Sequence, residues 1–189
     1  KFKILGFVTG GVDCSDRNAV IRAVTRAAII QENCKVIGIE EGFEGLVRNR
    51  TQELTIRSTR DILTLGGTIL GTTNKGNPFE YREYAPDGGI SIHDYSERAR
   101  QNFEALGLDC LIVVGGEGTM EIAHRLFEMG IPVIGIPKTI DNDLEMTDYT
   151  FGFQTAVAVA SDAMDRLPPN GRSHRRVRVL EVMGRHAVW

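Results

Sequence analysis

Residues 131–143 read IPVIGIPKTIDND. The apolar residues 131–136 predict a buried strand, and the polar residues that follow then lie at its C-terminal end. In open α/β sheets, this edge is where ligands bind. Asp141 and Asp143 offer one carboxylate that can act as a general base and a second that can hold a partner group or a metal. The alternative interpretation of these two side chains is a solvated acidic turn.

A second loop of the same form lies just upstream. Residues 111–114 predict a strand, residues 115–119 read GGEGT, and residues 120–129 predict a helix. This arrangement lets backbone N–H groups approach phosphate oxygens, because glycines have no Cβ to block the approach. Glu117 supplies a carboxylate of the kind that a Mg²⁺ bridging phosphates uses. A glycine-rich turn alone is common in this fold class, so the argument depends on two such loops after successive strands.

Strand and helix patterns alternate along the chain. Residues 43–93 are less regular and predict loops at Gly66-Gly67 and at 72–78. Alternating βα units predict an α/β fold with an open, mostly parallel, Rossmann-like sheet and helices on both faces. We expect strands at 2–8, 35–39, 110–114, 131–136 and 177–182, and helices at about 18–30, 94–107, 120–129 and 155–167.

Composition excludes several classes of protein. A net charge of −3 argues against a general nucleic-acid surface, although residues 172–178 form a basic cluster that suits a compact anion or a solvated turn. The three cysteines are widely spaced without a C-x-x-C pair, which argues against a disulfide framework or a zinc site. No apolar run reaches the ~20 residues that span a bilayer, and the N-terminus lacks a signal-peptide pattern. We therefore expect a soluble cytoplasmic protein without nucleic-acid or membrane partners.

The common nucleotide-binding motifs are absent. The sequence contains no G-x-x-x-x-G-K-[ST] loop, and the first turn, residues 10–13, does not give G-x-G-x-x-G. No G-x-S-x-G or Cys/His nucleophile pattern is present either. The remaining interpretation is phosphoryl transfer that uses glycine turns, carboxylates and arginines.

Five segments together resemble the N-terminal part of a 6-phosphofructokinase, and they extend over nearly the whole chain. They are residues 66–71 (GGTILG), 115–119 (GGEGT), 137–143 (PKTIDND), 147–153 (TDYTFGF) and 173–185, which end in the triplet MGR. The T-I-D-N-D core and the M-G-R triplet are highly specific together. The resemblance implies phosphoryl transfer from ATP to the 1-hydroxyl of fructose 6-phosphate, giving fructose 1,6-bisphosphate in glycolysis, with Mg²⁺ as cofactor.

The resemblance also implies a role for each matching residue. Asp141 would take the proton of the sugar hydroxyl, while Thr139 and Asp143 would position that hydroxyl and order the metal region. Arg176 would reach the sugar phosphate of a neighbouring subunit, or it belongs to a solvated basic turn. The other implied residues are catalytic Arg185; substrate-binding Met183 and Gly184; donor-binding Gly11, Gly116, Gly118, Thr119, Lys138, Asn74 and Lys75; and the metal ligand Glu117, where the family usually has an aspartate.

A few positions bear on the identity of the donor. Gly118 stands where the family's pyrophosphate enzymes usually carry a bulky acidic residue, and this favours ATP. Lys138 replaces a glycine of the common bacterial ATP enzymes and resembles the pyrophosphate-using branch. Asn74 stands where many ATP enzymes have an arginine, and the adjacent Lys75 can restore the charge. The combination resembles the mixed branch of the family, so we expect ATP, with pyrophosphate as the alternative.

The first loop departs from the family pattern, which usually reads G-G-D-x-P-G-x-N. Val12, Ser15 and Asp16 stand at altered positions. We expect Val12 to hinder backbone approach, and Asp16 both to cap the following helix and to bring an anion toward the donor phosphates. These changes keep open a catalytically impaired relative that binds nucleotide or another subunit. A lipid or NAD kinase, which shares a similar glycine turn, lacks the T-I-D-N-D and M-G-R context.

We expect residues 1–189 to form the N-terminal donor-binding and catalytic domain of such a protein. The C-terminal half, which supplies much of the sugar-phosphate site in the family, is absent from this sequence. The chain is therefore either a fragment of a longer protein or in need of a partner. A full-length subunit is expected to form a homo-oligomer, either a dimer or a tetramer.

Overall fold

The computed structural model describes residues 2–11, 14–73, 75–166, 173–177 and 179–184. A six-stranded sheet forms the body, and its strands are β1 (Ile4–Thr9), β2 (Lys35–Ile39), β3 (Thr51–Leu54), β6 (Cys110–Gly115), β7 (Val133–Thr139) and β8 (Phe151–Gly152). The spatial order is β3-β2-β1-β6-β7-β8, and only β3 runs antiparallel to its neighbour. This confirms the predicted α/β fold with an open, mostly parallel sheet.

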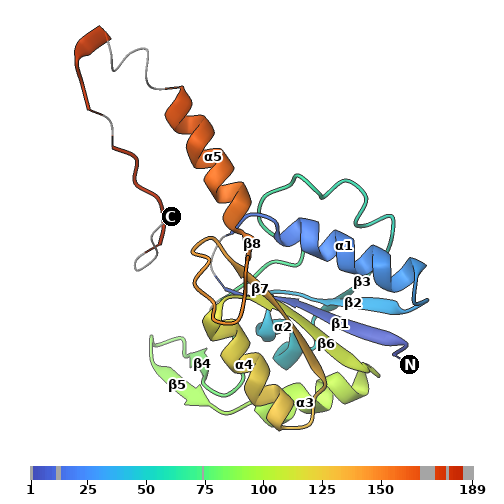
Figure 1. The fold of residues 1–189 in the computed structure, drawn as a ribbon. Helices are drawn as coiled ribbons and strands as arrows, with labels where there is room; N and C mark the ends of the chain where they lie inside the picture. Colours follow the sequence, from blue (N-terminus) through green and yellow to red (C-terminus); the bar gives the residue numbers. More distant parts are fainter. Residues whose placement is uncertain (1, 12–13, 74, 167–172, 178, 185–189) are drawn as a thin grey trace.

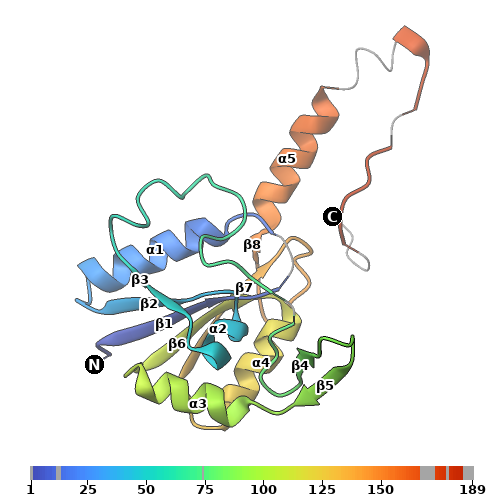
Figure 2. The same cartoon turned by 180° about the vertical axis from the view of Figure 1, so that it is seen from behind.

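Helices cover both faces of the sheet (Figure 1). One face carries α1 (Arg17–Ile30), and the other carries α2 (Phe43–Arg48), α3 (Ser96–Ala105) and α4 (Glu117–Glu128), as the reverse view confirms (Figure 2). Alternate strand residues supply the two core layers, because successive side chains of a strand point to opposite faces. Phe7 and Ile112 belong to the cluster that includes α1 residues, whereas Val8 and Val113 belong to the cluster with the other helices.

The segment 43–93, which the sequence predicts as irregular, contains more structure than expected. It holds α2, the edge strand β3 and a separate antiparallel hairpin of β4 (Tyr81–Tyr84) and β5 (Ile90–His93). These elements have four to six residues each. Such short elements do not complete enough periods for a hydrophobic pattern to become visible in the sequence.

The predicted strand at 177–182 is wrong. The described residues of this segment, 177 and 179–182, form no strand, and Val177 and Val179 are 90% and 92% exposed. The segment lies beyond α5 (Phe153–Asp165), which projects from one end of the sheet body (Figure 1). A strand needs a neighbouring strand to pair its backbone N–H and C=O groups, and the described residues of this segment pair with no strand of either sheet.

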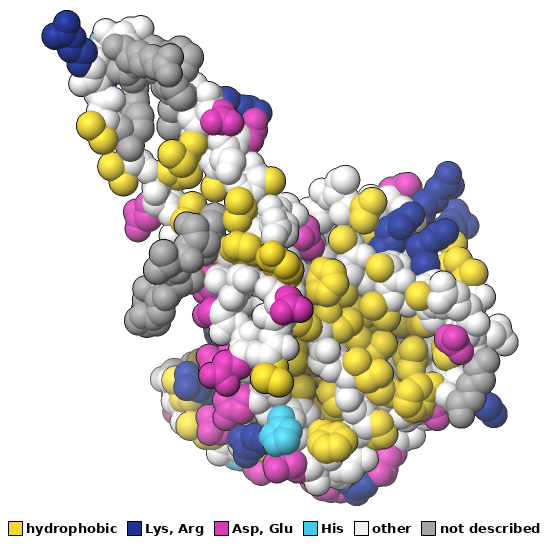
Figure 3. Space-filling view, viewed as in Figure 1, with side chains coloured by type: hydrophobic (Ala, Val, Ile, Leu, Met, Phe, Trp, Pro, Cys, Tyr) yellow, Lys and Arg dark blue, Asp and Glu magenta, His cyan; other side chains and the backbone are white. Residues whose placement is uncertain are grey.

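Apolar side chains are exposed on the sheet face next to α1 (Figure 3). Ile134 of β7 lies beside Ile112 in the sheet register, yet it is 49% exposed. No residue of α5 is buried. The layer containing α1 therefore covers the β1–β2 side of the sheet and leaves part of β7 uncovered.

No helix in the described part of the chain is both long and apolar enough to cross a membrane.

The order of the strands places a switch point between β1 and β6. From β1 the chain runs outward to β2 and β3, then returns and adds β6 on the other side of β1. Ligands of open α/β sheets bind at such a point, outside the C-terminal ends of the strands. The two loops that the sequence analysis selected, 115–119 and 137–143, follow β6 and β7, and the turn after β1 lies on the other side of the switch point.

Candidate active site

A cavity of about 520 Å³ opens at this edge of the sheet. Its wall combines loops that follow β1, β6 and β7, which lie far apart in the sequence. The predicted donor and metal residues that line it are Gly11, Gly116, Glu117, Gly118, Thr119 and Lys138, together with Thr139. The structure therefore brings most of the predicted donor site together.

Thr119 closes the glycine turn after β6. Its backbone N–H donates to the carbonyl oxygen of Gly116 at 3.0 Å, and its side chain packs over two glycines. A Cβ added to Gly115 would lie 2.3 Å from the Thr119 Cβ, and one added to Gly10 would lie 2.7 Å from its Oγ1. Packing against Thr119 therefore explains why these two positions are glycine.

Gly118, unlike Gly115 and Gly10, is not required by packing. A Cβ at this position would meet nothing within 4 Å, so the fold does not require its absence. Gly118 is the second residue of α4 and lines the cavity. The space beside it is therefore open cavity, next to the N–H groups and the positive end of a twelve-residue helix.

Lys138 places a cation in the cavity wall. Its side chain is only 2% exposed, and its Nζ would lie 3.4 Å from a Cβ added to Gly11. Gly11 has φ +82°, a left-handed conformation that glycine adopts readily. The ammonium group and the first turn of α4 both lie at this cavity, and together they favour an anionic ligand.

Two polar side chains close the loop after β7. The N–H of Thr150 donates to Asn142 Oδ1 at 2.9 Å, and the Thr150 hydroxyl donates to the carbonyl oxygen of Thr139 at 2.7 Å. Asn142 has φ +52°, which asparagine tolerates better than most residues. The Asp141 N–H donates to Thr139 Oγ1 at 3.1 Å. These contacts fix the backbone on both sides of Asp141.

The Asp141 carboxylate keeps free acceptor capacity. Its Oδ1 is buried and has no hydrogen-bond partner among the described residues. Buried polar atoms without partners are rare in folded proteins and often belong to functional sites. A general base needs such an oxygen to receive a proton.

The described residues contain no group of three or more His, Cys, Asp or Glu side chains that could hold a metal ion. Mg²⁺ usually keeps several waters and binds through one or two carboxylates together with substrate phosphates. Glu117 lines the cavity. This carboxylate fits a Mg²⁺ that arrives with phosphate ligands, and it does not form a complete protein cage.

Some predicted site residues lie away from this cavity. Lys75 lines a neighbouring hollow of about 620 Å³ between α2 and β4, where its Nζ lies 5.3 Å from the ring centroid of Tyr84. Asp143 is exposed at the surface of its loop. Asn74, Arg185 and Val12 lie outside the described residues.

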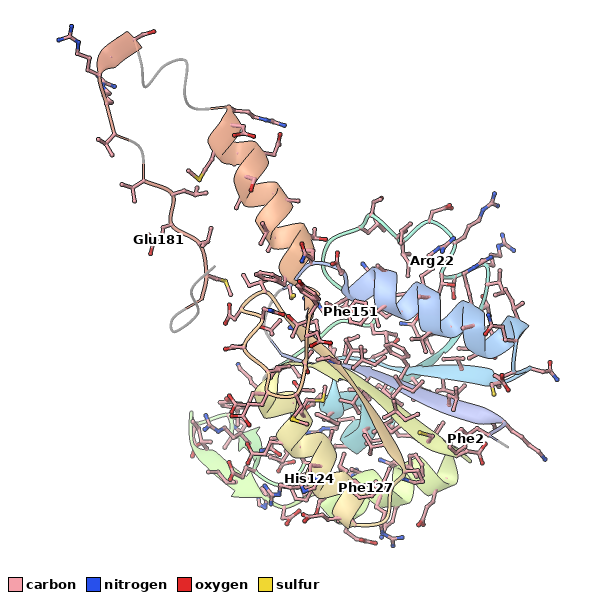
Figure 4. The ribbon with its side chains drawn as sticks, in the orientation of Figure 1. Phe2, Arg22, His124, Phe127, Phe151 and Glu181 are labelled. Carbon is pink, nitrogen blue, oxygen red and sulfur yellow. The ribbon has the colours of Figure 1, made fainter. Side chains whose placement is uncertain are left out.

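The predicted sugar-site residues are not brought to the cavity. Arg176 and Met183 are exposed, and with Gly184 they lie in the chain beyond α5. Glu181 identifies this segment in Figure 4, where it lies apart from the sheet edge. Their assignment stays a prediction from the resemblance.

One wall of the cavity was missed by the sequence analysis. It consists of residues from the start of α2, from the following loops and from one face of α4: Phe43, Thr73, Gly76, Asn77, Glu80, Glu121, Ile122 and Arg125. Helical spacing from Gly118 could have identified the α4 residues, because 118, 121, 122 and 125 share a face. The loop residues carry no comparable signal.

The expectation that the Asp16 side chain caps the first helix is wrong. Asp16 occupies the N-cap position of α1 with φ +72° but makes no side-chain capping bond, because a capping residue normally has an extended backbone. Its carboxylate instead accepts a hydrogen bond from Thr155 Oγ1 at 2.9 Å, and Asp16 does not line the donor cavity. Asn18 lies within α1, where its amide group bonds to the backbone of Leu65 and Ile69.

Comparisons with known proteins decide the family. A sequence model of the family Phosphofructokinase matches residues 4–189. The chain belongs to the phosphofructokinase family. Solved structures agree: the chain matches phosphofructokinase from Saccharomyces cerevisiae with a TM-score of 0.81 at 28% identity, covering 99% of this chain and 27% of that one.

Curated phosphofructokinase relatives with different donors are equally similar. The protein named ATP-dependent 6-phosphofructokinase 2 of Clostridium perfringens is 47% identical over 187 residues, covering 99% of this chain and 51% of the relative. The Streptomyces coelicolor protein named pyrophosphate–fructose 6-phosphate 1-phosphotransferase is also 47% identical, over 186 residues, covering 98% and 51%. The chain thus spans about half the length of the curated relatives it matches.

The hydrogen bond from the Thr150 N–H to Asn142 Oδ1 gives a first prediction. We expect Asn142→Ala to lower the free energy of unfolding by about 1–3 kcal/mol, because alanine loses the hydrogen bond and is less stable at positive φ. Glycine adopts the positive φ of this position readily, so Asn142→Gly measures the effect of losing the hydrogen bond alone. Amide hydrogen exchange at Thr150 should accelerate in both variants. Unchanged exchange at Thr150 in both variants would show that the hydrogen bond to Asn142 does not protect this amide.

Proposed function

We propose that this chain binds a Mg²⁺-complexed phosphoryl donor in the cavity, and that the complete protein transfers the terminal phosphoryl group to the 1-hydroxyl of fructose 6-phosphate. The observation that carries this proposal is the buried, unpartnered Oδ1 of Asp141. It follows the strand whose last residues, Lys138 and Thr139, line the donor cavity. A proton acceptor therefore stands next to an anion site, as phosphoryl transfer to an alcohol requires.

The proposed reaction assigns one task to each part of the site. N–H groups at the start of α4 and the Lys138 ammonium hold the donor phosphates. Asp141 takes the proton of the sugar hydroxyl, whose oxygen forms a bond to the terminal phosphorus as the bond to the leaving phosphate oxygen breaks. The leaving group is ADP, or phosphate when pyrophosphate is the donor. Glu117 would hold Mg²⁺, which neutralises charge on the donor phosphates when bound.

We infer that ATP is the donor and keep pyrophosphate as the alternative. Open space beside Gly118 supports ATP, and the cavity extends past the phosphate turn to Phe43, Ile122 and Arg125, which offer ring, aliphatic and guanidinium surfaces for a nucleoside. Buried Lys138 supports pyrophosphate, because a cation can hold a free phosphate. Similarity does not decide between them, since relatives with either donor are equally identical.

The remaining parts of the proposal concern the complete protein. We propose a cytoplasmic homo-oligomer in which Met183, Gly184 and Arg185 contact the sugar and Arg176 reaches the sugar phosphate of a neighbouring subunit. The alternative of an impaired relative loses one of its reasons, because Asp16 does not line the donor cavity.

Asp141→Asn tests the proton acceptor. In the complete protein, we expect kcat to fall at least ~100-fold, the typical contribution of a general base, because the amide cannot receive the proton. Donor affinity should change little, since Asp141 is not in the wall of the donor cavity. Steady-state kinetics and calorimetric donor titration measure the two quantities. Retained turnover would remove Asp141 from this role.

Gly118→Asp tests the donor. A carboxylate at this position would enter the open space at the start of α4 and repel nucleotide phosphates, so we expect ATP turnover to be lost while pyrophosphate turnover persists or appears. Gly118→Ala is the matched control, because its Cβ meets no neighbour and adds no charge. Parallel assays with both donors decide the outcome. An unchanged preference for ATP in Gly118→Asp would show that Gly118 does not face the donor.

A further inference from the structure

Three consecutive residues before α1 contact the junction of β8 and α5. Cys14 Sγ donates to the carbonyl oxygen of Phe151 at 3.6 Å, and Ser15 Oγ donates to that of Gly152 at 3.0 Å. The Thr155 hydroxyl lies 2.9 Å from both carboxylate oxygens of Asp16. Figure 4 shows the labelled Phe151 at the base of α5, beside the chain that enters α1. Segments that lie 137 to 139 residues apart in the sequence are therefore joined here.

The junction is tightly packed. A Cβ added to Gly152 would lie 2.1 Å from Cys14 Sγ, and Gly152 has φ +106°, so this position accepts only glycine without strain. Burial raises the pKa of the Cys14 thiol above its ordinary value, despite the nearby cations Lys138 and Arg17. The thiol is therefore protonated at neutral pH and can donate to the Phe151 carbonyl.

Asp16 has an unusual backbone for its contact. Its φ of +72° is a left-handed conformation, at the position where the resembling family pattern has a glycine. An L-residue with a side chain is less stable in this conformation than glycine, although aspartate is among the better tolerated residues. The contact with Thr155, in the first turn of α5, offsets this cost, because hydrogen bonds to ionised groups are strong and anions are stabilised at helix N-termini.

The same junction is linked through the sheet to the wall of the donor cavity. Phe151 and Gly152, whose carbonyls accept hydrogen bonds from Cys14 and Ser15, pair in the sheet with Lys138 and Thr139, which line the cavity. A change in the Asp16–Thr155 contact is thus transmitted through β8 to the part of the wall that Lys138 and Thr139 form.

We propose that Asp16 is a positioning residue, which acts through Thr155 to hold the start of α5 and β8 in place. Through the pairing of β8 with β7, this contact keeps Lys138 and Thr139 in the arrangement that binds the donor phosphates. This inference rests on the proposed function of the cavity as a donor site. It assigns a use to the one loop that departs most from the family pattern: the acidic side chain fastens the loop to α5 and does not face the donor.

Paired variants in the complete protein separate positioning from stability. Asp16→Gly removes the side chain and relieves the left-handed backbone, so the melting temperature should change little while donor binding weakens. Thr155→Val removes the hydroxyl at similar size. We expect each to raise the Kd for Mg-ATP about tenfold, which is about 1.4 kcal/mol, and the double variant to do no more than either alone. Asp16→Asn and Thr155→Ser keep an acceptor and a donor and should stay within about twofold.

Asp162→Ala is the matched control on the same helix. Asp162 is exposed and pairs with Arg166, so its loss should leave the Kd unchanged. Calorimetric titration with Mg-ATP and with Mg-pyrophosphate, alongside thermal unfolding, provides the readouts. Unchanged binding in Asp16→Gly and Thr155→Val, additive effects in the double variant, or tighter binding in Asp16→Gly would each overturn the positioning role alone. Absence of binding of either donor to the unaltered protein would overturn the proposed donor site itself, and the positioning role with it.

Discussion

The parallel pairing of β1, β6 and β7 is the constraint on which the rest of the structure depends. In this register Thr9 lies beside Val114 and Gly115 beside Pro137, so the three strands end at one level. The loops that follow must then share one edge of the sheet. The first turn of α4, the backbone of Gly11 and the Lys138 ammonium consequently face a single cavity, although no two of them are close in the sequence. The proposed binding of an anionic donor at this cavity depends on this placement.

Sequence patterns predicted the elements that build this edge. Residues 35–39 were expected as a strand and form β2, and the strands around 110–114 and 131–136 were displaced by only a few residues. Buried parallel strands are continuous apolar runs, and the glycine turns after them interrupt those runs sharply. Both signals are local, and they marked the loops after β6 and β7, which supply part of the wall of the donor cavity.

The errors arose where structure depends on partners that the sequence does not specify. Residues 177–182 have the apolar, β-branched composition of a strand, but strand formation requires an adjacent edge, and the described residues of this segment pair with none. Asp16 has the composition of a helix cap, but its left-handed backbone turns the carboxylate toward Thr155, a residue far along the chain. The wall around Phe43 and Asn77 comes from short elements and loops without periodicity, so no pattern could identify it.

Amide hydrogen exchange of the complete protein, with and without saturating Mg-ATP, tests the central claim most directly. If the strand edge holds the donor phosphates, protection should increase at Gly11, at residues 116–120 in the first turn of α4, and at Lys138 and Thr139. Protection that is absent there and confined to the hollow between α2 and β4 would contradict the account.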